Sequence, residues 1–155
     1  PLFVPRYNAN YQIVQTPDHV VILAEHNHDA RIIPLDVKPQ PEWMRRWMGY
    51  SRGHWEGDTL VVETAGFVPG DEFKPATPIL VGQNARVVER FTRISEKEIL
   101  YRFRVVDPET FSRPWSAEML LTDTGEPMFE YACHEANLSM VNMLACGRSA
   151  DAVKR

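Results

Sequence analysis

The feature that most constrains the fold is a series of short segments in which apolar side chains alternate with polar ones. Between residues 99 and 106 every odd position is apolar or aromatic, whereas Arg102 and Arg104 occupy two of the even positions. Because successive side chains of a β-strand point to opposite faces, this segment has one face for a core and one for water. The period of two therefore predicts antiparallel strands with one wet face.

Turn residues separate these segments at intervals that suit hairpins. Proline and aspartate at 17–18 favour one turn, and glycine and aspartate at 57–58 favour another. Short polar turns at 95–97 and 123–125 link two further pairs of segments. The sequence predicts strands at residues 11–16, 19–26, 30–35, 51–56, 59–67, 85–94, 99–106, 115–122 and 128–135.

Two other segments have helical spacing. Residues 41–48 place Trp43 and Trp47 four apart between a proline and a glycine, as in a short helix. Apolar residues also recur at helical spacing between 138 and 144, which predicts a short C-terminal helix. Residues 68–83 have no clear period and are expected to form an exposed loop.

The chain length matches a single domain, since 155 residues lie near the commonest domain size. We expect one all-β domain over residues 1–155, with an extended arm at 1–10 and the helix and tail at 136–155. An antiparallel up-and-down meander of about eight strands commonly removes its exposed edges by closing into a barrel. A barrel of that size holds packed side chains or one small ligand.

Composition excludes several classes of protein. A net charge of -4, with the basic residues scattered, argues against a nucleic-acid partner. Apolar runs such as residues 20–24 are too short to cross a bilayer, which needs about 20 residues. Cys133 and Cys146 lack the spacing of a zinc or redox site, and a disulfide or two free thiols are both compatible with the sequence. No motif requires a cofactor, and the sequence leaves open whether a divalent metal binds.

Histidines supply the sharpest local pattern. His26 and His28 lie two apart in a predicted strand, so both imidazoles would face one side and share a metal ion. His54 or His134 would then complete the site. The alternative is that these histidines are exposed or hydrogen-bonded at a strand end.

Acid–base and anion-binding chemistry would use other polar residues. His28, or His134 with the adjacent Glu135, are the candidate catalytic residues. Arg31 and Arg52 lie in largely apolar strands. If they face inward they must pair with acidic residues, and such a network either orients an anionic ligand or braces the barrel.

Aromatic residues from several predicted strands are candidates for the wall of a ligand cavity. Such cavities are mostly apolar and carry a few polar anchors. The alternative is that these aromatic residues fill the core. The candidates are Trp55, Tyr101, Trp115 and Tyr131.

The sequence contains six distinctive blocks: residues 28–33 (HDARII), 47–49 (WMG), 51–64 (SRGHWEGDTLVVET), 89–93 (ERFTR), 113–115 (RPW) and 130–135 (EYACHE). Together these blocks resemble a family of uncharacterised, mostly exported bacterial proteins. The resemblance implies a periplasmic or secreted location and a lipocalin-like β fold, and it implies no established activity. It also points to the polar residues of the shared motifs as site residues: His28, Arg31, Arg52, Glu56, Tyr131, His134 and Glu135.

Three functions agree with these observations. The favoured hypothesis is a small-molecule-binding barrel of the bacterial envelope, whose ligand is apolar or aromatic and carries an anionic or polar group. The second is a lyase, isomerase or hydrolase that uses histidine and glutamate as acid–base residues and arginine as an anchor, with or without a metal. The third is an interaction subunit of an envelope assembly, which would have a protein partner.

Overall fold

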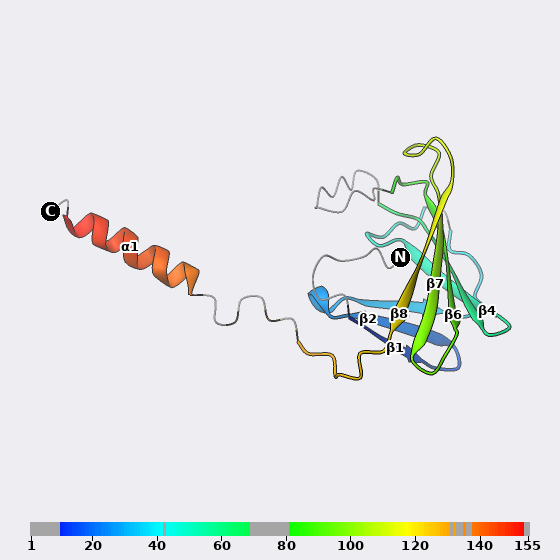
Figure 1. Cartoon of the computed structure of the whole chain (residues 1–155). Helices are drawn as coiled ribbons and strands as arrows, with labels where there is room; N and C mark the ends of the chain where they lie inside the picture. The colour runs from blue at the N-terminus through cyan, green and yellow to red at the C-terminus, as the bar shows by residue number, and fades with distance from the viewer. Residues whose placement is uncertain are drawn as a thin grey trace.

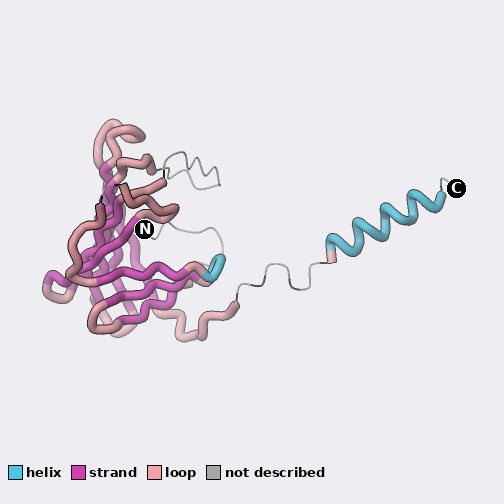
Figure 2. Tube along the Cα trace, turned by 180° about the vertical axis from the view of Figure 1, so that it is seen from behind, coloured by secondary structure: helices cyan, strands magenta, loops and turns pink. Residues whose placement is uncertain are grey.

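The computed structural model describes residues 10–41, 43–68, 81–130, 132, 135 and 138–153. Within them the chain forms eight strands, a short 3-10 helix η1 and one α-helix, α1 (Figures 1 and 2). The elements are β1 Tyr11–Gln15, β2 His19–Ala24, η1 His26–His28, β3 Ala30–Pro34, β4 Tyr50–Glu56, β5 Thr59–Ala65, β6 Arg86–Arg93, β7 Glu98–Val106, β8 Trp115–Thr122 and α1 Ser139–Val153.

The strands form two antiparallel sheets whose order follows the chain. The first sheet is β1-β2-β3 and the second is β4-β5-β6-β7-β8. The turn between β1 and β2 is closed by the Thr16 backbone N–H, which donates to the His19 carbonyl at 2.8 Å. The turn between β4 and β5 contains Gly57 with a φ of 56°, a left-handed conformation that glycine adopts without strain. The predicted antiparallel meander and these hairpins are confirmed.

The core lies between the inner faces of the two sheets. Gly53 on β4 allows a close approach of the first sheet, because an added Cβ would lie 3.0 Å from Leu35 Cδ2 and 3.1 Å from Ile33 Cγ2. Leu35 and Gly53 also form an isolated parallel bridge between the sheets. The core residues are Val20, Ile22, Ile33, Leu35, Leu60, Val62, Phe67, Ala85, Val87, Phe91, Tyr101, Phe103 and Val105.

Closure into a barrel is not confirmed. In the described part of the chain β1 and β8 are the outer strands of their sheets, and each pairs with one neighbour only. After β3 the chain does not make a hairpin, because residues 36–49 form an irregular connection before β4 begins. A fold of two antiparallel sheets is therefore the architecture that the structure establishes.

Two predicted elements are wrong. The described residues of segment 41–48 form turns, because the Arg46 backbone makes long-range bonds: its N–H donates to the Gly66 carbonyl and its carbonyl accepts from Val68 N–H. The predicted ninth strand, 128–135, has no strand residue at its described positions 128–130, 132 and 135. Apolar alternation indicates a strand, but it does not by itself place a segment beside a partner strand.

The predicted C-terminal helix is confirmed and is longer than its apolar pattern indicated, since α1 has 15 residues. In Figures 1 and 2 this helix stands apart from the two sheets. No helix in the described residues is long and apolar enough to span a bilayer.

Candidate functional site

A buried polar network joins the two sheets. Arg31 on β3 reaches across the core, where its Nε donates to Ser51 Oγ at 2.9 Å and its second terminal nitrogen donates to Thr64 Oγ1 at 2.7 Å. The guanidinium also forms a bidentate ion pair with Glu89 on β6. Tyr101 on β7 donates its hydroxyl to Glu89 Oε1 at 2.9 Å. Arg31 of the first sheet thus contacts three strands of the second, and Tyr101 joins a fourth strand to the network through Glu89.

Glu89 is ionised in this network. Its side chain is completely buried, and burial by itself raises the pKa of a carboxyl group. Nearby positive charge, including that of Arg31, and the hydrogen bonds from Arg31 and Tyr101 oppose burial and bring the pKa of Glu89 to about 2. A carboxylate with these partners is stable inside the core.

This arrangement favours bracing over ligand binding for Arg31. The guanidinium has five N–H groups, and its contacts with Ser51, Thr64 and Glu89 account for four hydrogen bonds. One N–H group remains, and because the Arg31 side chain is only 13% exposed, little of the guanidinium is open to a ligand. The sequence left bracing and anion binding open, and the geometry supports bracing.

Arg52 and Glu56 lie on the opposite, outer face of the second sheet. Arg52 pairs with Glu63, its direct cross-strand neighbour. Glu56 pairs with Arg90 and lies 3.3 Å from His54 Nε2. Hydrogen bonds from Arg90 and His54 hold the pKa of Glu56 below its usual value. The candidate polar residues are therefore divided: Arg31 lies in the core with Glu89, whereas Arg52 and Glu56 lie on the outer face of the second sheet.

The candidate aromatic residues are divided between the core and the surface. Tyr101 stacks with Phe103 at 5.5 Å, and Trp115 meets Phe103 edge to face at 5.4 Å between ring centroids. The Trp115 Nε1 atom is buried and has no hydrogen-bond partner in the described structure. Trp55 is exposed near the β4–β5 turn and lines a shallow, open depression. Tyr131 lies outside the described residues.

The structure contradicts the expectation that His26 and His28 lie on a strand and face the same side. His26 and His28 belong to η1, not to a strand, because the chain turns there and the Ala24 N–H donates to the Asp29 carbonyl. His28 is exposed and has a φ of 53°. His54 is on β4, on the outer face of the second sheet. No group of three histidine, cysteine or acidic residues in the described part of the chain is placed to hold a metal ion.

Of the remaining catalytic candidates, the structure describes only Glu135. Glu135 is exposed, and its backbone N–H donates to the Ala132 carbonyl in a turn. His134, like its neighbour Cys133, lies outside the described residues. Cys146 is a free, exposed cysteine on α1.

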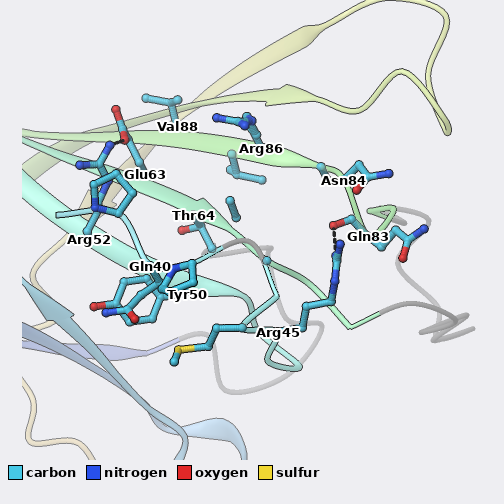
Figure 3. Close-up of a pocket in the computed structure, with 17 residues that line it drawn as sticks. Gln40, Arg45, Tyr50, Arg52, Glu63, Thr64, Gln83, Asn84, Arg86 and Val88 are labelled. Atoms are coloured by element: carbon cyan, nitrogen blue, oxygen red, sulfur yellow. Dashed lines mark hydrogen bonds and ion pairs between the residues drawn. The ribbon is translucent and has the colours of Figure 1, made fainter.

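A cleft with convergent polar groups lies at one end of the second sheet (Figure 3). Its volume is about 480 Å³, which is within the range of small-molecule sites. One wall is the irregular connection before β4, and the other consists of the end of β5 and the start of β6. The lining residues that carry polar side chains are Gln40, Arg45, Tyr50, Arg52, Glu63, Thr64, Gln83, Asn84 and Arg86.

Among the described residues that line the cleft, positive charge is in excess, since three are arginines and one, Glu63, is a carboxylate. Arg45 fixes one wall by donating to the carbonyls of Phe67 at 3.0 Å and Gln83 at 2.8 Å. Arg52 is neutralised by Glu63. Arg86 is exposed and takes part in none of the ion pairs of the described residues, so its charge is available to a ligand.

Sequence reasoning missed most of this cleft. Of the predicted site residues only Arg52 lines it. Arg45 and Tyr50 belong to or follow the segment that was interpreted as a helix, and Arg86 opens a strand that begins more than thirty residues later. No local pattern indicates that these segments meet.

Comparison with known proteins adds no assignment: no family model, curated protein or solved structure matches the chain. The resemblance to exported bacterial proteins stays a prediction.

Proposed function

We propose that the protein binds a small organic anion with an aromatic or apolar part in the cleft at the end of the second sheet. The observation that carries the proposal is Arg86, which lines a cleft of about 480 Å³ and forms no ion pair with another described residue. Guanidinium groups bind carboxylates and phosphates with two parallel hydrogen bonds.

The rest of the lining suits such a ligand. Tyr50 and Met44 supply apolar and aromatic surface. The Gln40 and Gln83 side chains supply neutral amide donors and acceptors (Figure 3). Tyr50 is also supported from outside by Arg46, whose guanidinium carbon lies 5.6 Å from the ring centroid. A ligand with an anionic end and a flat ring would meet complementary groups at both ends.

The test is thermal unfolding in the presence of phenyl phosphate, benzoate and inorganic phosphate. A ligand that binds only the folded protein raises the unfolding temperature by mass action. We expect phenyl phosphate to raise it most, because that compound offers both the ring and the anion. High salt should weaken the effect, since the ligand and Arg86 attract each other partly through unscreened charge.

A matched pair of variants tests the site. Arg86→Gln should abolish the rise in unfolding temperature, whereas Arg104→Gln should keep it. Arg104 is an equally exposed arginine on the outer face of β7, opposite Val88, and it does not line the cleft. No response to any of the three compounds, or an equal response in both variants, would contradict the proposal.

The enzyme alternative has weaker support. A lyase, isomerase or hydrolase needs an acid–base residue beside its ligand. Among the described lining residues no histidine occurs, and Glu63 is ion-paired with Arg52. Binding without catalysis therefore agrees better with the cleft.

The proposal also extends to the type of β fold and to the cellular location of the protein. We propose that the two sheets belong to a lipocalin-like barrel and that the protein acts in the bacterial envelope. The order of the strands in a meander supports the first expectation. The resemblance of the six motif blocks to exported proteins supports the second.

A further inference from the structure

The two sheets present very different outer faces to water. On the outer face of the second sheet, four contacts join a basic side chain to an acidic one. Two of them are Arg52 with Glu63 and Arg102 with Glu118. A charged outer face is the ordinary state of an antiparallel sheet that has solvent on one side. This face is therefore suited to contact with water.

The outer face of the first sheet carries no aspartate, glutamate, lysine or arginine. Its inner face is defined by the buried Val20, Ile22 and Ile33, so the alternate residues point outward. In register across the three strands these include Val14, Val21 and Ile32. Val14 is 45% and Ile32 is 62% exposed. The whole outer face comprises Gln12, Val14, His19, Val21, Leu23, Ala30, Ile32 and Pro34.

Helix α1 is a second apolar surface without a partner. Five large apolar side chains at positions 138–144 are each more than half exposed, and the segment 138–147 contains no charged residue. The helix stands apart from both sheets (Figures 1 and 2). Exposed apolar surface of this kind marks an interaction site. The side chains are Leu138, Met140, Val141, Met143 and Leu144.

We propose that two copies of the chain exchange their C-terminal helices, each α1 packing on the outer face of the other copy's first sheet. The outer face of the first sheet matches residues 139–147 of α1 in chemistry, because both are apolar and neither carries a charge. The charged Arg148 and Asp151 follow in the second half of the helix. One chain leaves both surfaces open, and a reciprocal exchange covers both. Exchange of an identical element is a common route to symmetric dimers.

The surfaces also match in size. A helix of 15 residues is about 22 Å long and about 10 Å wide. Strands of 5 or 6 residues are about 17–20 Å long, and three of them span a similar width. The exchange makes two helix–sheet contacts, which together bury on the order of 1,000 Å², near the lower limit for a specific interface.

The test begins with the mass of the full chain, measured by light scattering or sedimentation over a wide range of concentration. We expect a dimer that dissociates on dilution. Ile32→Glu and Met143→Glu should each shift the protein to monomer, because each places a charge in the contact. Leu120→Glu is the matched control: Leu120 is 49% exposed, lies on β8 and should leave the dimer intact.

Cross-linking identifies the contact itself. In a Cys133→Ser background, Cys146 on α1 remains as a natural thiol probe. Ile32→Cys in that background should give a covalent dimer with a short bifunctional maleimide, and Leu120→Cys should not. A monomer at every concentration, a cross-link confined to one chain, equal cross-linking of both variants, or a dimer that survives both glutamate substitutions overturns the proposal.

Discussion

The Arg31–Glu89 pair leads to a prediction whose size follows from burial. Glu89 is 0% exposed and the Arg31 side chain is 13% exposed. Replacing only the cation leaves the buried Glu89 carboxylate without its bidentate partner. Breaking a buried ion pair from one side costs about 3–5 kcal/mol. We therefore expect Arg31→Met, which keeps the apolar stem, to lower the free energy of unfolding by about 3–5 kcal/mol at neutral pH.

The pH dependence gives a second measure of the same pair. The pKa of Glu89 is about 2 in the folded protein and 4.5 without perturbation. A folded-state pKa below the unfolded value adds stability that is fully present above the unfolded pKa and is lost as the pH falls through the folded pKa. This shift corresponds to about 3 kcal/mol. In Glu89→Gln, the free energy of unfolding should therefore fall less than in the wild type between about pH 5 and about pH 2.

The assay is urea denaturation followed by tryptophan fluorescence, at neutral and at acid pH. The control is Arg102→Met, since Arg102 and Glu118 form a surface pair in which both side chains are more than half exposed. Such pairs contribute about 0–1 kcal/mol. A loss below about 1 kcal/mol for Arg31→Met, equal to that of the control, would refute the reasoning that the pair is a buried brace.

Three further predictions concern the frame around the cleft and the core. Gly53→Ala should lower the free energy of unfolding by about 1–3 kcal/mol in urea denaturation, because the new Cβ would press on Leu35 at the junction of the sheets. Asp107→Ala should cost about 1–3 kcal/mol, because the Asp107 carboxylate accepts the Gly82 N–H at 2.6 Å, and amide hydrogen exchange at Gly82 should become faster. Phe103→Ala should cost about 3–5 kcal/mol in the same denaturation assay, since Phe103 packs between two aromatic rings in the core.

The strands and their faces could be predicted because their signal is local. In β7 the buried Tyr101 and Phe103 alternate with the exposed Arg102 and Arg104, as the period of two requires. Turn residues likewise act within a few positions, so the hairpin at 57–58 could be located from the sequence. These features depend on neighbouring residues alone.

Segment 41–48 shows where local patterns fail. The four-residue spacing of Trp43 and Trp47 predicts a helix, yet both side chains are exposed and the segment forms turns. The backbone of Arg46 instead bonds to a segment some twenty residues later. A long-range bond of this kind leaves no trace in periodicity.

The candidate site depended on the tertiary structure in the same way. The alternation of side chains assigns Arg31 and Arg52 each to one face of its own strand. It does not indicate which faces of the two sheets pack against each other. Packing of the two sheets turned Arg31 inward to Glu89 and left Arg52 on the outer face with Glu63.

The sequence by itself thus determined the strands, most of their turns, the C-terminal helix and the alternation of core and solvent faces. The tertiary structure alone decided the division into two sheets, the partners of each buried charge and the cleft that contains Arg86. The physical reason is range: backbone propensity and side-chain alternation act over a few residues, whereas sheet packing joins segments far apart in the chain.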